Sequence, residues 1–270
     1  MIGVFDSGIG GLSVLAAVAR ALPCPDFLYF ADTAHLPYGD KDDDAIRARA
    51  LRIGRYLAEQ GCRPIVVACN TATAAAVAAL RDALPRVPVI GVEPGIKPAA
   101  AASKSGRIAV LATVSTARSE RLSNLIRRHA GPAQVDVVPC PGWATRVETL
   151  RLADPDFAAE ARALLEPVLA AGADRIVLGC THYAFLAPAL APIVAGRAEL
   201  VDVAEAVARQ CRRLAGTGGG EAGGSGEAAR PGRLTLAATA DPDRLRQALT
   251  VLGLESLAAR FNAPAILAKV

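Results

Sequence analysis

The sequence has little lysine, few aromatic residues and no long apolar run. Of its 30 basic residues only four are lysines, namely Lys41, Lys97, Lys104 and Lys269. Basic side chains are scattered among acidic ones and aromatic residues make up 4% of the chain, so nucleic-acid binding is not expected as its primary role. No apolar stretch approaches the roughly 18 residues that a membrane-spanning helix needs, and no membrane association is expected.

The six cysteines do not form the patterns of a metal or disulfide protein. There is no C-x-x-C pair, and Cys180-x-His182 stands alone, so no metal site is expected. The chain opens with MIGVFDSG, which lacks the basic and apolar segments of an export signal. We therefore expect a cytoplasmic protein whose cysteines are free thiols.

What the sequence does contain is a 52% apolar composition arranged in short β-rich runs between amphipathic segments. This alternation predicts an α/β fold with mainly parallel sheets covered by helices on both faces. The expected strands are Ile2–Phe5, Phe27–Phe30, Ile65–Ala68, Val89–Val92, Ile108–Leu111, Val135–Val138, Ile176–Leu178, Leu200–Val201 and Leu234–Ala237. The expected helices are 11–22, 43–60, 72–83, 117–129, 156–171, 185–194, 204–214 and 242–252, the last capped by Asp241 before Pro242.

The chain also shows a loose internal repetition. In each half a strand ends in hydroxyl-bearing residues, and a later strand ends in cysteine. We expect two similar lobes, the first made of residues 1–95 with 208–270 and the second of residues 96–207. The low-complexity segment Gly216–Gly232 is expected to be a flexible loop that interrupts the first lobe.

Ligands of parallel α/β sheets bind at the carboxyl ends of the strands, so the motifs at those ends are the candidate site. FDSGIGGLS places Asp6 and Ser7 before a glycine turn; it lacks the third glycine of a dinucleotide loop and the lysine of a P-loop. Either a capped turn or a cradle for a carboxylate fits this motif. In ADTAHLPYGDK, Tyr38 either covers a small substrate or stabilises the turn, and His35 is expected to be a surface residue.

Two cysteines stand where an apolar strand gives way to a helix. Cys69 in VVACNTATA and Cys180 in IVLGCTHYA are placed where a helix N-terminus stabilises a thiolate, whereas Cys24, Cys62, Cys140 and Cys211 are expected to be buried apolar residues. A Cys/His hydrolase using His182 is one interpretation, but it leaves the other cysteine without a role. Paired acid and base on opposite faces of one substrate uses both.

Taken together, DSGIGGLS, PYG, ACNTATA and GCTHY resemble the glutamate racemases of the cofactor-independent aspartate/glutamate racemase superfamily. The resemblance runs from Gly3 to about Asp202, with a looser match at TADPDRLR. It implies interconversion of L- and D-glutamate without a cofactor, at a site between the two lobes of a homodimeric protein that supplies D-glutamate for peptidoglycan. None of the lysines stands in an obvious aldimine-forming context, which agrees with a route that needs no pyridoxal phosphate.

The resemblance also implies roles for individual residues. Cys180 would deprotonate L-glutamate and Cys69 D-glutamate, with Asp6 assisting Cys69, and His182 and Glu148 assisting Cys180. The residues implied to hold the substrate are Asp6, Ser7, Pro37, Tyr38, Gly39, Cys69, Asn70, Thr71, Thr116, Cys180, Thr181 and His182.

The chain departs from the family pattern at three places. CPGWATRVE replaces a usually apolar segment before Glu148, Leu122 replaces a frequent tyrosine, and Val203 replaces a frequent serine. All catalytic positions are kept, so the departures bear on loop geometry and regulation. A racemase for another acidic amino acid, above all aspartate, and a non-catalytic amino-acid-binding protein of the same two-lobed build are the alternatives.

Overall fold

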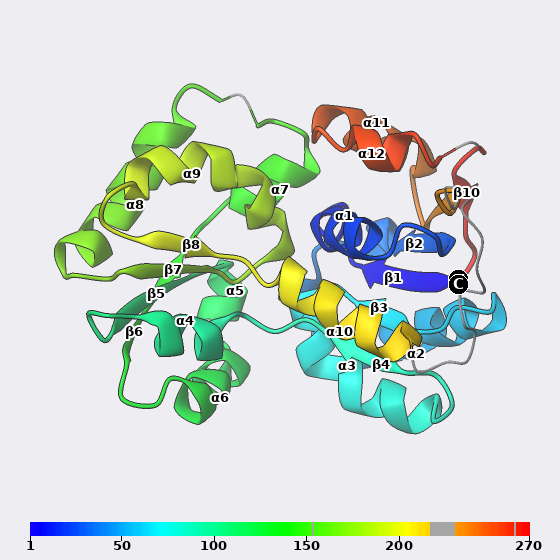
Figure 1. Ribbon diagram of the computed structural model, residues 1–270, viewed down its shortest axis with the longest axis horizontal. Helices are drawn as coiled ribbons and strands as arrows, with labels where there is room; N and C mark the ends of the chain where they lie inside the picture. The colour runs from blue at the N-terminus through cyan, green and yellow to red at the C-terminus, as the bar shows by residue number, and fades with distance from the viewer. Residues whose placement is uncertain (153, 217–229, 262) are drawn as a thin grey trace. The chain divides into compact units, whose positions relative to one another are not determined.

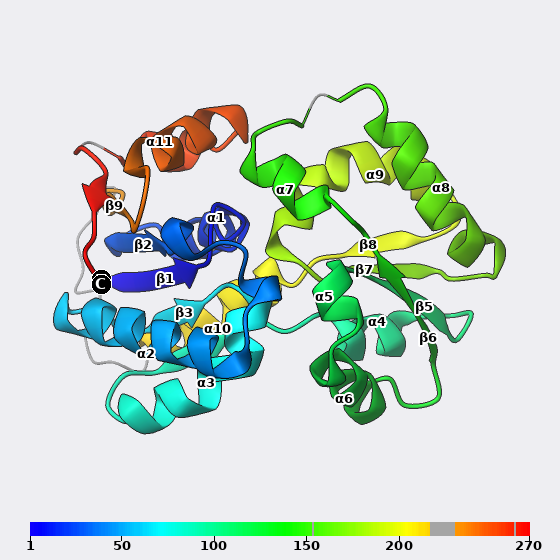
Figure 2. The same ribbon diagram turned by 180° about the vertical axis from the view of Figure 1, so that it is seen from behind.

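The structure is a computed structural model that describes residues 1–152, 154–216, 230–261 and 263–270 (Figures 1 and 2). These residues form two compact units. Unit 1 combines Met1–Val92 with Ala204–Val270, and unit 2 is Glu93–Val203. Most of the glycine-rich segment 216–232, for which a flexible loop is expected, lies outside the described residues.

Unit 1 is built on a parallel six-stranded sheet in the order β10-β9-β2-β1-β3-β4. The strands are β1 (Ile2–Asp6), β2 (Phe27–Ala31), β3 (Ile65–Val67), β4 (Val89–Gly91), β9 (Leu234–Ala238) and β10 (Ile266–Leu267). Strands β1, β2 and β3 are buried along their whole length, which is the environment that continuous apolar runs predict. The register pairs Phe5 of β1 with Val67 of β3, so both strands end at the same edge of the sheet.

Helices cover both faces of this sheet (Figures 1 and 2). They are α1 (Leu12–Ala21), α2 (Asp43–Glu59), α3 (Asn70–Ala83), α10 (Ala204–Gly216), α11 (Pro242–Val251) and α12 (Glu255–Ala258), with the short 3₁₀ helices η1 (Thr33–His35) and η2 (Tyr38–Asp40) after β2. Helix α1 packs against α10, and α2 packs against α3 on the other face. The core under α2 and α3 includes Phe5, Val67 and Leu80.

Unit 2 is a smaller parallel sheet in the order β6-β5-β7-β8. Its strands are β5 (Arg107–Ala112), β6 (Gln134–Pro139), β7 (Arg175–Leu178) and β8 (Glu199–Val201). Its helices are α4 (Ile96–Ala102), α5 (Val114–Ala117), α6 (Glu120–His129), α7 (Trp143–Glu148), α8 (Phe157–Ala170) and α9 (Ala187–Val194), with the 3₁₀ helix η3 (Thr181–Leu186). Helices α4 and α6 lie on one face of the sheet, and α8 and α9 pack together on the other (Figure 1).

The predicted α/β fold with parallel, helix-covered sheets is confirmed, and details differ. The helix expected over 117–129 is present as α6, which begins at Glu120 because the hydroxyl of Ser119 accepts a hydrogen bond from the backbone N–H of Leu122, and the short α5 precedes it. Asp241 precedes α11 as expected, but it has a positive φ of 46° and its side chain makes no capping bond. None of the described helices is long and apolar enough to cross a membrane.

Candidate active site

In unit 1 the candidate site begins where β1 ends. Asp6, the last residue of the strand, is buried, and its Oδ1 accepts hydrogen bonds from the Ser7 hydroxyl at 3.1 Å and the Gly8 backbone N–H at 3.2 Å. The glycine turn leaves room for this carboxylate, since a Cβ on Gly11 would lie 2.7 Å from Asp6 Oδ2. The GIGG motif thus allows the start of α1 to lie against the buried Asp6 carboxylate. This close contact explains the need for glycine without a dinucleotide-binding loop.

The first cysteine, Cys69, is linked to Asp6 through the hydroxyl of Ser7. Cys69 caps the N-terminus of α3, where its Sγ accepts a hydrogen bond from the backbone N–H of Ala72 at 3.4 Å. Its thiol also donates to the Ser7 hydroxyl across 3.7 Å. A chain of polar contacts therefore runs from the thiol through Ser7 to the Asp6 carboxylate, and it lies at the edge where β1 and β3 end together.

Tyr38 packs in the same core cluster as Cys69, with its ring edge-on to Phe5 at 6.3 Å. Its hydroxyl donates to Asp32 Oδ2 at 2.6 Å. Burial and the neighbouring Asp32 carboxylate raise the pKa of Tyr38 far above its ordinary value, so the phenol is neutral and acts as a donor. His35 is partly exposed, and its Nδ1 lies 3.0 Å from Asp32 Oδ1.

Asp32 is a buried carboxylate that the sequence analysis did not identify. Arg49 donates to both of its oxygens, from Nε at 3.0 Å and Nη2 at 2.8 Å, and the Thr239 hydroxyl donates to Oδ1 at 2.9 Å. Burial alone would raise the pKa of Asp32, but the bonds from Arg49 and Tyr38 outweigh it and lower that pKa. Its position directly after β2 is the sequence signal that could have identified it, whereas Arg49 and Thr239 come from other elements.

In unit 2 the second cysteine stands beside an imidazole and a carboxylate. His182 Nδ1 lies 3.4 Å from Cys180 Sγ, and His182 Nε2 lies 2.6 Å from Glu148 Oε1. Burial would lower the pKa of His182, but Cys180 and then Glu148 outweigh it and raise that pKa well above its ordinary value. Glu148, which the resemblance places near the second thiol, contacts His182, and the imidazole links this carboxylate to the thiol.

The backbone around Cys180 is set by close contact between neighbouring strands. Gly179 donates its N–H to the carbonyl of Leu111 at 2.8 Å, and a Cβ on Gly179 would lie 2.5 Å from that oxygen. Cys180 follows with extended backbone before the 3₁₀ helix η3, and the α-helix expected over 185–194 begins after η3 as α9. At the end of β5, the hydroxyl of Thr113 donates to that of Thr116 at 2.9 Å, and Thr181 is buried at the start of η3.

The remaining cysteines are not placed to take part in proton transfer. Cys62, Cys140 and Cys211 are buried as expected, and burial raises the pKa of Cys140 to about 12 and that of Cys62 to about 11. The expectation of a buried Cys24 is wrong: this residue is exposed in the loop between α1 and β2. Among the described residues, no group of three or more histidine, cysteine, aspartate and glutamate side chains could hold a metal ion.

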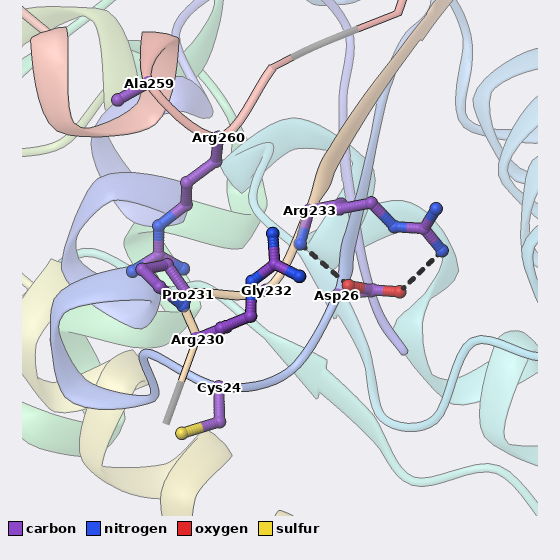
Figure 3. A pocket seen from close by; sticks show the side chains of 8 residues that line it. All are labelled: Cys24, Asp26, Arg230, Pro231, Gly232, Arg233, Ala259 and Arg260. Carbon is purple, nitrogen blue, oxygen red and sulfur yellow. Dashed lines mark hydrogen bonds and ion pairs between the residues drawn. The ribbon is translucent and has the colours of Figure 1, made fainter. Parts of the chain in front are cut away.

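A surface cavity of about 710 Å³ lies in unit 1, and none of the predicted site residues lines it (Figure 3). Two of its arginines are hydrogen-bonded: Arg233 donates from its backbone N–H to Asp26, which also lines the cavity, at 2.7 Å, and Arg260 donates to the backbone carbonyls of Ala19 and Pro23. The cavity therefore adds nothing to the candidate site.

The structure groups the predicted residues by unit. Asp6, Ser7, Tyr38 and Cys69 lie together in unit 1, with Asn70 and Thr71 in the first turn of α3 beside Cys69. In unit 2, Cys180 and His182 lie together with Glu148. Each thiol therefore stands at a strand end beside a different acid–base group, an arrangement that suits proton transfer in an α/β protein.

The chain is similar to known racemases along almost its entire length. The sequence model of the family described as Asp/Glu/Hydantoin racemase matches residues 3–211. The glutamate racemase of Pseudomonas putida F1 is 47% identical over 251 residues, which are 93% of this chain and 93% of that protein.

Two solved structures resemble this one. The Escherichia coli glutamate racemase in complex with L-glutamate and the activator UDP-MurNAc-ala superposes with a TM-score of 0.81 at 30% identity, covering 99% of each chain. The glutamate racemase of Francisella tularensis in complex with D-glutamate has a TM-score of 0.78 at 25% identity and covers 99% of this chain and 97% of its own. The chain belongs to the Asp/Glu/Hydantoin racemase family, and it is an enzyme of the amino-acid racemase class.

Proposed function

We propose that this protein is a glutamate racemase that interconverts L- and D-glutamate by a two-thiol proton transfer without a cofactor. The observation that carries the proposal is the pair of cysteines at strand ends, each beside a different acid–base partner: Cys69 with Ser7 and Asp6, and Cys180 with His182 and Glu148. Relatives named glutamate racemase support the substrate, and two of them were solved with the L and the D enantiomer respectively.

In the proposed reaction, glutamate lies between the two thiols, one on each face of its α-carbon. The Cys180 thiolate removes the α-proton of L-glutamate, so a C–H bond breaks and an S–H bond forms. The Cys69 thiol then gives its proton to the opposite face of the carbanion, and its S–H bond is exchanged for a new C–H bond. D-Glutamate reacts in the reverse sense, starting at Cys69.

The partners of each thiol reset its protonation between turnovers. The Ser7 hydroxyl, which accepts from Cys69 and donates to Asp6, connects that thiol to a buried carboxylate. On the other side, the protonated His182 imidazole stabilises the Cys180 thiolate, and Glu148 stabilises the imidazolium. The two thiols are thus served by different groups, which suits a site that must work on both enantiomers.

Polar groups near the thiols are proposed to hold the substrate. The buried amide oxygen of Asn70 has no hydrogen-bond partner among the described residues, and it can accept from the substrate ammonium. The two carboxylates are assigned to donor groups of Ser7, Tyr38, Gly39, Thr71, Thr116, Thr181 and His182. Pro37, which has no N–H, is proposed to contact the substrate without donating a hydrogen bond. Fixed donors around the carbanion take over the stabilisation that a cofactor provides in other racemases.

The same reasoning gives the cellular setting that we propose. The enzyme would act in the cytoplasm as a homodimer and supply D-glutamate for peptidoglycan. Enclosure of the bound substrate would exclude water from the carbanion.

The test is racemisation of L-glutamate by the purified protein with no added cofactor, followed by circular dichroism and, in deuterated water, by NMR of the α-position. We expect full racemisation with solvent deuterium in the product enantiomer. Cys69→Ala and Cys180→Ala should each lower kcat by about 10²- to 10⁴-fold, the usual contribution of a general acid or base. Cys62→Ala, which removes a buried thiol of unit 1 from outside the site, should leave kcat unchanged.

Two results would contradict the proposal. Efficient racemisation of aspartate together with inert glutamate would show that the substrate is wrong. Normal turnover in either Cys69→Ala or Cys180→Ala would show that the reaction does not need two thiols.

A further inference from the structure

An arginine of helix α7, the helix that carries Glu148, joins it to the segment around the start of α8. Arg146 forms ion pairs with Asp154, in the loop before α8, and with Glu160, in the first turn of α8, where Nη2 lies 3.2 Å from Oε2. Its guanidinium also stacks over the Phe157 ring at 5.1 Å from the centroid. These three contacts join α7 to the start of α8.

The indole of Trp143 completes this attachment at the other end of α7. Trp143 is fully buried between Phe157, at a ring distance of 5.0 Å, and Tyr183 of η3, at 5.5 Å. Its Nε1 donates to Glu160 Oε1 at 2.8 Å. Glu160 therefore receives both Trp143 and Arg146, which lie one helical turn apart and point to the same side of α7.

Glu148 projects from the opposite side of this helix. Arg146 and Glu148 are two positions apart, which is about 200° around a helix. With one side fixed to α8, the other side of α7 packs on η3, and Glu148 Oε1 comes to 2.6 Å from His182 Nε2. At α7's C-terminal end Leu150 adopts a positive φ of 58°, and the N–H of Arg151 closes the last turn on the carbonyl of Arg146 at 2.9 Å.

We propose that Arg146 is a positioning residue, which holds α7 against α8 so that the carboxylate of Glu148 meets the imidazole of His182. The inference rests on the proposed function, in which Glu148 and His182 serve the Cys180 thiol. It gives a role to the unusual segment CPGWATRVE, in which Arg146 stands where the family that the sequence resembles usually has an apolar residue. A helix of six residues has little stability of its own, so its place depends on such contacts.

The test compares Arg146→Met, which removes the charge, with Arg146→Lys, which keeps the charge and loses the forked guanidinium. Arg197→Met is the matched control, because Arg197 makes a two-pronged ion pair with Glu166 elsewhere in unit 2, at 2.8 and 3.0 Å. Two quantities are measured on each protein: kcat/KM for glutamate, and the titration of the His182 imidazole by ¹⁵N NMR, assigned by its absence in His182→Asn.

We expect Arg146→Met to lower kcat/KM by about 10- to 100-fold, the scale at which misplacing a catalytic group is felt. The His182 titration should move to lower pH, because the bond from Glu148 is among the contacts that raise its pKa against the effect of burial. Arg146→Lys should lie between Arg146→Met and the unchanged protein, and Arg197→Met should match the unchanged protein in both measurements.

Normal turnover in Arg146→Met, or lost turnover with an unmoved His182 titration, would overturn the inference. If Arg146→Met does not fold, Glu160→Gln replaces it, since the amide keeps the shape of the side chain and weakens the ion pair with Arg146. Normal turnover in Glu160→Gln, or lost turnover with an unmoved His182 titration, would then overturn the inference. The titration is read on the protein itself. A protein that fails to racemise glutamate would therefore refute the proposed function while the position of Glu148 is still tested.

Discussion

Asp32 has surroundings that no local sequence motif could predict. Its carboxylate is completely buried and accepts from Tyr38 and Thr239, while Arg49 provides the balancing charge. Removing one partner of a buried pair leaves the other charge uncompensated, which costs more than the pair itself contributes. The phenol of Tyr38 would lose its acceptor at the same time.

We therefore expect Asp32→Asn to lower the free energy of unfolding by about 3 to 5 kcal/mol near neutral pH. The folded-state pKa of Asp32 lies below its ordinary value, so its contribution is present above the unfolded-state pKa of about 3.9 and is lost as the pH falls through the folded-state value. The difference between the two proteins should therefore narrow below about pH 4. Urea unfolding between about pH 3 and 7 measures it.

Asp44→Asn is the control for this experiment. Asp44 pairs with Arg47 on the surface of α2, and its side chain is 89% exposed, so the substitution should change stability little at any pH. A constant difference between the unchanged protein and Asp32→Asn across the whole pH range would show that Asp32 is not charged in the folded state.

At the scale of elements, the close approach of β5 and β7 sets the position of Cys180. Gly179→Ala would place a methyl group against the carbonyl of Leu111, a backbone atom that cannot move without disturbing β5. We expect a loss of about 1 to 3 kcal/mol in unfolding free energy, typical of overpacking, and a fall in kcat because Cys180 is displaced.

Gly172→Ala separates the two effects. Gly172 has a φ of 93°, which strains any other residue, but nothing lies within 4 Å of an added Cβ. This variant should lose stability and keep its kcat. Equal kcat losses in the two variants would mean that the Gly179 effect is one of stability and not of the position of Cys180.

The elements also show what the sequence could predict. The nine expected strands all occur, because β-branched and apolar runs between turn residues are a strong local signal. Two elements carry no such signal. Both residues of strand β10 are exposed, and helix α7 is only six residues long and directly follows Gly142, which has a left-handed backbone. Their places depend on contacts with β9 and α8.

The candidate site divides in the same way. Residues next to their strand ends, such as Asp6, Cys69 and Cys180, could be selected from motifs, because parallel strands bring such ends together. Arg49 and Thr239 could not, since they reach Asp32 from a helix and from a strand end more than 200 positions away. The same holds for Glu160, whose bonds to Trp143 and Arg146 cross from one helix to another.

At the scale of the whole molecule, the two units differ in how the chain builds them. Unit 2 is a continuous stretch, Glu93–Val203, and all pairings among β5, β6, β7 and β8 lie inside it. Unit 1 needs residues from both sides of that stretch. We expect a fragment of residues 93–203 to fold by itself.

Trp143, the one tryptophan of the chain, allows a direct measurement. In the fragment its fluorescence should be that of a buried indole and should change at the same urea concentration as the far-ultraviolet circular dichroism. A companion fragment of residues 1–92 should not unfold cooperatively, because β2 lacks β9. Separate transitions for the two probes in 93–203, or no transition at all, would show that unit 2 depends on unit 1.

The bond between Thr239 and Asp32 has a consequence for the order of synthesis. When the ribosome has completed β1, β2 and β3, the carboxylate of Asp32 has Arg49 nearby, but β2 still lacks its neighbour β9. All of unit 2 is made before that neighbour appears. Unit 1, whose first segment is translated before unit 2, is thus the last to be finished. Asp32, the acceptor of the Tyr38 hydroxyl, gains its bond from Thr239 only when the final fifth of the chain leaves the ribosome.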